Sequence, residues 1–182
     1  MNSEYFKIAI TPEQIESDES QLIQGALLSG FDYVHLRHPD ASLRDMRNLI
    51  ESIPPRYHSR LKLHGHFELL HSFNLGGVHL NSRCPSAPHQ FTGSISRSCH
   101  SIDELFEVKD CEYVTLSPIF DSISKQGYKS AFSDEDLRRL SQVRNVPVIA
   151  LGGVTPERVK LLEPYGFSGY AVLGALRSFL DL

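Results

Sequence analysis

The chain has 182 residues, 41% of them hydrophobic and 22% charged, and its net charge is −4. This size and composition are typical of a globular protein with a single core, so one domain spanning residues 1–182 is expected. The chain has an excess of acidic residues and no cluster of Lys or Arg, so binding to nucleic acid is not expected. No apolar stretch is long enough to cross a bilayer, so no membrane partner is expected.

The cysteines and the N-terminal residues bear on where the protein works. Cys84, Cys99 and Cys111 are odd in number and widely spaced. This usage argues against a disulfide framework and favours a reducing compartment. The first residues also lack the pattern of a secretory signal. A cytoplasmic protein is therefore expected, while the sequence leaves the oligomeric state open, a homo-oligomer included.

Short apolar segments alternate with amphipathic segments along the whole chain. Most of the apolar segments are continuously apolar, as expected for β-strands that are covered on both faces. Eight strands are expected: Phe6–Ile10, Tyr33–Leu36, Arg60–His64, Gly77–Leu80, Ser94–Ser98, Tyr113–Leu116, Val146–Leu151 and Gly169–Val172.

Helix start signals lie between several of these strands. Ser42, Ser101 and Ser133 are each followed three positions later by an acidic residue, the pattern of a capping box. Thr155 precedes a proline suited to the first helical position. The segment 81–92 contains Pro and Ser but few apolar residues, so a loop with a short or missing helix is expected there.

Eight strands, each followed by a crossover, predict an α/β fold of the compact (β/α)8 TIM-barrel type. The chain is shorter than the ~250 residues typical of that fold, so trimmed helices are expected. A doubly wound open sheet is compatible with the same alternation. No G-x-G-x-x-G motif follows the first strand, which disfavours a dinucleotide-binding version of such a sheet.

The segment from Ser117 to Gly127 has the residues of a phosphate-binding loop. It leaves the sixth strand and carries hydroxyls, an ammonium group and a glycine. Hydroxyls donate to phosphate oxygens, Lys supplies a positive charge, and Gly lets the backbone approach an anion closely. Read with the Gly152-Gly153 pair at the end of the seventh strand, the segment predicts half of an anion-binding mouth. A polar surface loop is the alternative.

Six segments in chain order resemble the thiamine phosphate synthase and TenI-like family of small barrels. They are Tyr33–Arg37, Gly77–Leu80, Ser98–Ser101, Ser117–Gly127, Ala150–Val154 and Gly169–Leu176. The resemblance implies an enzyme of thiamine metabolism, a transferase that joins a pyrimidine-methyl pyrophosphate to a thiazole phosphate and releases pyrophosphate. Its partners would be small phosphorylated molecules: thiazole phosphate, thiamine phosphate and pyrophosphate.

The same resemblance implies roles for individual residues. The monophosphate would be held by a set of hydroxyls, one ammonium and backbone groups: Ser122, Ser124, Lys125, Gly152, Gly153, Leu173 and Gly174. Ser98 would bind substrate by facing the pyrophosphate together with Arg37. The expected catalytic residues are Arg37, His35, His64 and Lys125. Arg37 would face the pyrophosphate, and His35 or His64 would be the acid–base or pyrimidine-contacting group. For Arg37, the structural alternative is an ion pair with Asp40 or Asp45.

The chain departs from the family pattern in the half of the mouth that would take pyrophosphate. Family members usually hold Mg2+ with carboxylates after the third and fourth strands, but the chain has Gly65 at the first position and no acid near Arg83. Mg2+ therefore remains an expected cofactor without its usual ligands, and no residue is assigned to a metal. The TenI-like acid–base histidine is replaced by Pro118. A TenI-like tautomerase, a non-catalytic or regulatory phosphate-binding barrel, and an enzyme acting on another phosphorylated substrate stay open as alternatives.

Histidines are frequent at the predicted C-terminal ends of strands: His35, His64, His66, His79 and His100. In a barrel these ends converge on one mouth. Imidazoles suit proton transfer near neutral pH, and they bind Zn, Ni or Cu better than Mg. The spacing of His64 and His66 is a weak metal signal without a third ligand, and His79 and His100 are equally consistent with packing or capping. Cys99 alternates with Ser98 and is expected to face the helix layer.

Overall fold

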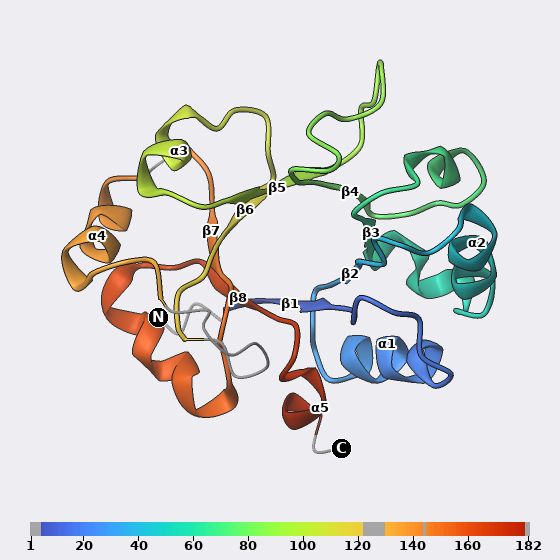
Figure 1. Ribbon diagram of the computed structural model, residues 1–182, viewed down its shortest axis with the longest axis horizontal. Coiled ribbons are helices and arrows are strands. Elements are labelled where there is room, and N and C mark those ends of the chain that lie inside the picture. The colour runs from blue at the N-terminus through green and yellow to red at the C-terminus, as the bar shows by residue number, and fades with distance from the viewer. Residues whose placement is uncertain (1–4, 122–129, 144, 181–182) are drawn as a thin grey trace.

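The computed structural model describes residues 5–121, 130–143 and 145–180. Eight parallel strands follow one another around a closed barrel, and the last pairs with the first (Figure 1). The predicted (β/α)8 barrel is confirmed and the open sheet is excluded. The strands are β1 (Phe6–Ile10), β2 (Tyr33–Leu36), β3 (Leu61–Leu63), β4 (Gly77–Leu80), β5 (Ile95–Cys99), β6 (Tyr113–Leu116), β7 (Val148–Ala150) and β8 (Gly169–Val172).

Helices surround the barrel, but most of them are short, as the length of the chain predicted. The α-helices are α1 (Glu19–Leu28), α2 (Leu43–Glu51), α3 (Ile102–Glu107), α4 (Asp134–Arg138) and α5 (Leu176–Phe179). The 3-10 helices are η1 (Pro55–Arg60), η2 (Phe67–His71), η3 (Arg139–Gln142) and η4 (Pro156–Tyr165). Between β4 and β5 the described chain forms a loop without a helix, as expected. None of the described helices is long and apolar enough to span a membrane.

The serine caps predicted from the sequence are present. The side chains of Ser42, Ser101 and Ser133 accept hydrogen bonds from backbone N–H groups in the first turns of α2, α3 and α4. Each bond satisfies an N–H group that the helix itself leaves without a partner. The cap expected at Thr155 was wrong, because its side chain makes no capping bond to η4. The tighter 3-10 geometry of that segment changes where the first N–H groups point.

The apolar core has an outer and an inner part. Strand residues such as Val34, Leu36 and Cys99 pack outward against the helices, and the predicted outward position of Cys99 is confirmed. The inner part includes four aliphatic side chains, which we call the apolar sector: Ile8, Ile10, Ile149 and Ala171. They come from β1, β7 and β8, which are neighbours in the barrel.

The rest of the barrel interior is polar although it is buried. Alternation along each strand turns every second residue inward, so the outward Val34 and Leu36 leave His35 facing the barrel axis. We call five inward, buried side chains of β2 to β6 that have hydrogen-bond partners the polar sector: His35, Lys62, His79, Ser96 and Tyr113. Such groups are stable in an interior only when they are hydrogen-bonded or paired.

Lys62 shows how this requirement is met at the N-terminal end of the barrel. Its Nζ lies 2.7 Å from Glu112 Oε2 and 2.7 Å from Ser94 Oγ. It also lies over the rings of Tyr33 and Tyr113, 4.6 and 4.3 Å from their centroids. A carboxylate, a hydroxyl and two aromatic faces together compensate for burial of the ammonium group.

Candidate active site

The C-terminal ends of the strands surround a cavity of about 630 Å³. A cavity of this volume is large enough for a small organic substrate. Its lining includes most of the candidate residues that the structure describes: Arg37, His64, Ser98, Gly152, Gly153, Leu173 and Gly174. His35 is fully buried beneath them and does not line the cavity. Ser122, Ser124 and Lys125 lie outside the described residues, so their roles stay predictions.

The glycine pair after β7 is shaped by the segment that follows β6. Backbone bonds from Ile119 N to Leu151 O, 2.9 Å, and from Phe120 N to Gly152 O, 3.0 Å, hold the two segments together. Gly152 and Gly153 have φ values of 96° and 62°, and a Cβ on either would approach that segment within 2.8 and 2.4 Å. Only glycine fits at such a close approach in this backbone conformation.

These glycines leave backbone donors at the rim of the cavity. No described residue accepts a hydrogen bond from the N–H of Gly153 or of Gly174. Both residues line the cavity, and Gly174 lies just before α5. Backbone N–H groups after the seventh and eighth strands are the common anion-binding arrangement in TIM barrels. The rim can therefore bind a phosphate through its backbone.

Arg37 also lines the cavity, and it follows β2. Its backbone N–H donates to Thr11 Oγ1 at 2.9 Å, and its guanidinium pairs with Glu13 Oε1 at 3.0 Å. The ion-pair alternative thus named the wrong partners, since Asp40 pairs with Arg83 instead. The Arg37 side chain remains 34% exposed, so an anionic substrate can compete with Glu13 for the guanidinium.

A buried contact between a histidine and a glutamate lies beside Arg37, and no pattern in the sequence indicated it. His38 Nε2 lies 2.7 Å from Glu19 Oε1 and 3.1 Å from Thr11 Oγ1. The side chains of His38 and Glu19 are fully buried. The pair joins the start of α1 to the end of β2, so it fixes the segment from which Arg37 extends. It is recognisable only once the chain is folded, because the two residues are remote in sequence.

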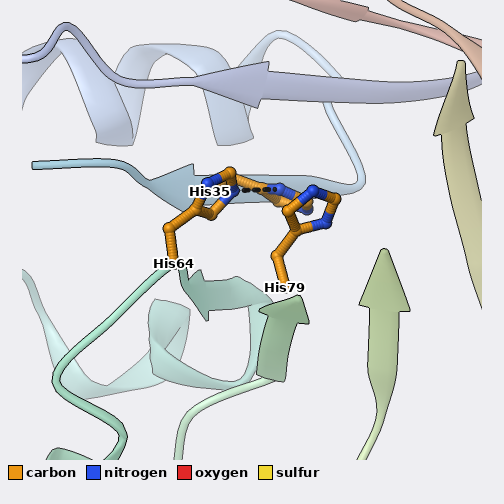
Figure 2. A group of neighbouring side chains, drawn as sticks. All are labelled: His35, His64 and His79. Carbon is orange, nitrogen blue, oxygen red and sulfur yellow. Dashed lines mark hydrogen bonds between the residues drawn. The ribbon is translucent and has the colours of Figure 1, made fainter. Parts of the chain in front are cut away.

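Three histidines from the adjacent strand regions of β2, β3 and β4 meet inside the barrel (Figure 2). His35 Nδ1 lies 2.9 Å from His64 Nε2, and His35 Nε2 lies 2.6 Å from the hydroxyl of Tyr113. The rings of His64 and His79 stack with their centroids 4.3 Å apart. The structure therefore brings together the two predicted histidines, His35 and His64, and adds His79, for which packing had been an equal interpretation.

Hydroxyl groups hold the third member of this cluster. His79 Nδ1 lies 2.9 Å from Ser96 Oγ, and His79 Nε2 lies 2.9 Å from Ser98 Oγ. Ser98 was predicted to bind substrate, and it does line the cavity. Its contact with His79 was not foreseen. The strand register explains this contact. β4 and β5 pair in parallel with His79 opposite Ser96, and Ser98 lies two residues further along β5, on the same face as Ser96.

Burial keeps these imidazoles neutral. It lowers the pKa of His79 to about 3, and the positive charge of Lys62 acts in the same direction. Burial, followed by the neighbouring imidazoles, also holds the pKa values of His35 and His64 well below 6.5. Near neutral pH the cluster therefore consists of uncharged rings, each with one nitrogen lone pair. Such rings can accept a proton or bind a metal ion.

The other two histidines predicted at the mouth, His66 and His100, are separate from the cluster. His66 Nε2 lies 2.8 Å from the carbonyl oxygen of Ala41, and His100 Nδ1 lies 3.2 Å from that of Ser117. Both line the cavity, but each is held by a backbone acceptor rather than by another imidazole. They are thus natural comparisons for the clustered histidines.

Carboxylates are scarce at this mouth. Glu13 is the only acidic residue among the described residues that line the cavity, and it pairs with Arg37. Mg2+ prefers six oxygen ligands and is usually held by one or two carboxylates plus substrate phosphates and water. The described lining therefore does not fit a protein-held Mg2+ site.

Comparison with known proteins places this geometry in a family. A family model described as Thiamine monophosphate synthase matches residues 8–176. The thiamine-phosphate synthase of Syntrophomonas wolfei is 24% identical over 194 residues, covering 100% of this chain and 93% of that protein. That of Salinibacter ruber is 24% identical over 180 residues, covering 92% and 79%. A crystal structure of thiamine phosphate pyrophosphorylase from Bacteroides thetaiotaomicron is 35% identical with a TM-score of 0.83, covering 95% of this chain and 85% of that one. The resemblance read from the sequence is confirmed.

Proposed function

The chain belongs to the thiamine monophosphate synthase family, and we propose that it is a thiamine-phosphate-synthase-like transferase of thiamine biosynthesis. Its substrates would be a thiazole phosphate and a pyrimidine-methyl pyrophosphate, joined in the barrel mouth with release of pyrophosphate. This proposal keeps the reaction expected from the sequence and assigns it to the described cavity.

One observation carries the proposal: Arg37 and the glycine rim line the same cavity. The reaction needs two anion sites, one for a monophosphate and one for a pyrophosphate. The backbone N–H groups of Gly153 and Gly174 suit the first site, and the guanidinium of Arg37 suits the second. A cavity of about 630 Å³ between them has room for the two rings to meet.

Each group in the mouth has a physical task in this reaction. As the bond to pyrophosphate breaks, negative charge grows on the leaving group, and Arg37 stabilises that charge. The glycine rim fixes the thiazole phosphate and so orients the attacking ring. The neutral imidazole of His64 would contact the pyrimidine from the floor of the cavity, and the hydroxyl of Ser98 would donate to the pyrophosphate beside Arg37. Lys125, outside the described residues, is expected to act on phosphate. Mg2+ would reach the site on substrate phosphates, so no step is assigned to a protein-held ion.

Formation of thiamine phosphate from the two substrates tests this function. We expect turnover by the wild-type protein and a loss of about 100-fold or more in kcat/KM for Arg37→Ala, the magnitude seen when a group that stabilises developing charge is removed. Arg138→Ala is the matched control, because Arg138 pairs with Asp134 on α4 and does not line the cavity. Its activity should equal that of the wild type.

The scarcity of carboxylates favours one second candidate, a non-catalytic barrel that binds thiazole phosphate or thiamine phosphate. Calorimetry with these compounds separates the two functions. Binding without any turnover would reject the synthase and support the binding protein. No binding of either compound, and none of pyrophosphate, would reject both.

A further inference from the structure

The cluster of His35, His64 and His79 has the composition and spacing of a metal site. Each residue offers one ring nitrogen, and the three nitrogens all lie within 4.8 Å of one another. The side chains converge from neighbouring strand regions of the barrel rather than from one flexible loop (Figure 2). Ligands that are positioned by strands are held with better precision than ligands on loops.

We propose that these three imidazoles bind a divalent transition-metal ion, with Zn2+ as the best match, at the floor of the mouth cavity. Imidazole is a ligand that suits Zn2+, Ni2+ and Cu2+ and that Mg2+ disfavours. Three histidines with an open fourth position are a known arrangement for catalytic zinc. The proposal concerns binding alone and does not depend on the transferase function.

Small rotations of the rings complete the geometry. Zn–N bonds of about 2.0–2.1 Å in a tetrahedral site separate the ligand nitrogens by about 3.4 Å. His35 Nδ1 and His64 Nε2 are 2.9 Å apart, slightly closer than this separation, because they share a hydrogen bond. The other nitrogen–nitrogen distances in the cluster are at most 4.8 Å, about 1.4 Å above this separation. The cluster is therefore arranged close to a bound geometry, with the hydrogen bond in place of the ion.

Outer hydrogen bonds orient the ring of His79. Ser96 Oγ donates to the carbonyl oxygen of Val78 at 3.2 Å, so it accepts from His79 Nδ1–H. This tautomer leaves the lone pair of His79 on Nε2, which lies 2.9 Å from Ser98 Oγ. Hydrogen bonding to the far nitrogen is how metal-binding histidines are usually fixed.

The ring of His35 is held in the same manner. Its Nε2 lies 2.6 Å from the hydroxyl of the buried Tyr113. When Nε2–H donates to that hydroxyl, the lone pair of His35 is on Nδ1, the nitrogen that faces His64. His35 thus has one nitrogen held by a partner and the other directed at His64. In His79 the lone pair on Nε2 accepts from Ser98, and this hydroxyl would have to turn away when an ion binds.

The surroundings leave one coordination position open. His64 and His79 line the cavity, whereas His35 lies below it. An ion held by the three rings therefore faces the cavity, where water or a phosphate oxygen would complete its coordination. The nearest buried cation, Lys62, pairs with Glu112 at 2.7 Å, which reduces its repulsion of a divalent ion.

Metal titration of the full-length protein, stripped with a chelator, tests the site. We expect one Zn2+ per chain by calorimetry and by competition with a chromophoric chelator, with no displacement by millimolar Mg2+. The matched variants are His64→Gln and His79→Gln against His66→Gln and His100→Gln, which alter mouth histidines outside the cluster. Zn2+ affinity should fall by about 100-fold or more in the first pair and stay unchanged in the second.

A second measurement guards against variants that do not fold. Co2+ bound to the wild-type protein should give the intense visible absorption of a four- or five-coordinate site with nitrogen ligands. His64 stands at a strand end and is only half-buried, so His64→Gln is the variant best suited to retain the barrel, which circular dichroism would confirm. Absence of stoichiometric Zn2+ and Co2+ binding by the wild type would overturn the proposal. So would binding that survives in folded His64→Gln or that is lost in His66→Gln or His100→Gln; the cluster would then be a hydrogen-bonded network alone.

Discussion

In the polar sector of the barrel interior, two imidazoles and an ammonium group are buried with hydroxyls, whereas the apolar sector beside it is built from Ile8, Ile10, Ile149 and Ala171. The two sectors share one closed sheet and one strand register. They differ in how each contributes to the mouth above. Above the polar sector, the side chains of His64, Ser98 and Arg37 line the mouth cavity.

Above the apolar sector, the mouth is lined by backbone groups of glycines rather than by polar side chains. Above Ile149 and Ala171 lie Gly152, Gly153 and Gly174, whose contribution is conformation and exposed N–H groups. Dry aliphatic packing below gives this rim a rigid support. One half of the barrel thus combines apolar packing with exposed backbone donors, while the other buries polar groups, which lower stability, and brings polar side chains to the mouth.

The largest expected difference between the two sectors is their effect on the free energy of unfolding in acid. In the unfolded chain a histidine takes up a proton below about pH 6.5, but the native cluster stays neutral because burial lowers its pKa values, that of His79 to about 3. The unfolded state then binds more protons, so the free energy of unfolding falls as the pH falls below 6.5. The loss is up to about 1.4 kcal/mol per pH unit for each of the three histidines. Urea unfolding at pH 7, 6 and 5 measures it.

Two variants, one in each sector, show which sector causes the loss of stability in acid. His79→Asn removes one of the titrating groups, so its stability should fall less steeply between pH 7 and pH 5. Ile149→Val removes a buried methyl from the apolar sector and should cost about 1 kcal/mol equally at every pH. Equal pH slopes for His79→Asn and the wild type would show that the cluster does not carry the acid sensitivity.

Sequence patterns were informative where a feature is local in the chain. The strands, the serine caps and the glycine pair each depend on a few adjacent residues, and they were located correctly. Strand ends were less accurate: β3 ends at Leu63, one residue before the predicted end, which places His64 at the mouth.

The missed features depend on which strands become neighbours. His79 was expected near the mouth, but its contact with His35 and His64 was not, because only closure of the barrel turns its ring toward them. Likewise, Glu13 became the partner of Arg37 and Glu19 that of His38 because the end of β1 and the start of α1 lie against the end of β2. Such pairs join residues about twenty or more positions apart, so residue spacing could not indicate them.

Substitution of the glycine rim tests the other sector. In Gly153→Ala the new Cβ would lie 2.4 Å from the carbonyl oxygen of Asp121, at a φ of 62°. We expect a loss of about 2–4 kcal/mol in the free energy of unfolding and at least tenfold weaker binding of inorganic phosphate. Gly166→Ala is the matched control, because its φ is 76° but nothing lies within 4 Å of the new atom. It should lose about 1 kcal/mol and bind phosphate normally. Equal phosphate affinity in both variants would contradict the backbone anion site.

The smallest effect is expected from Lys62, although it is a fully buried charge. Breaking a buried ion pair usually costs about 3–5 kcal/mol because the remaining charge is stranded without water. Here the remaining partner, Glu112, has a side chain that is 38% exposed, so it can be hydrated once Lys62 is gone. Lys62→Met also keeps the apolar stem and removes the need to bury an ammonium group. We therefore expect Lys62→Met to lower the free energy of unfolding by only about 1–2 kcal/mol. Arg138→Met, which breaks the exposed pair with Asp134, should have no measurable effect. Loss of the fold in Lys62→Met would instead show that the polar sector, like the apolar one, is needed for the barrel to close.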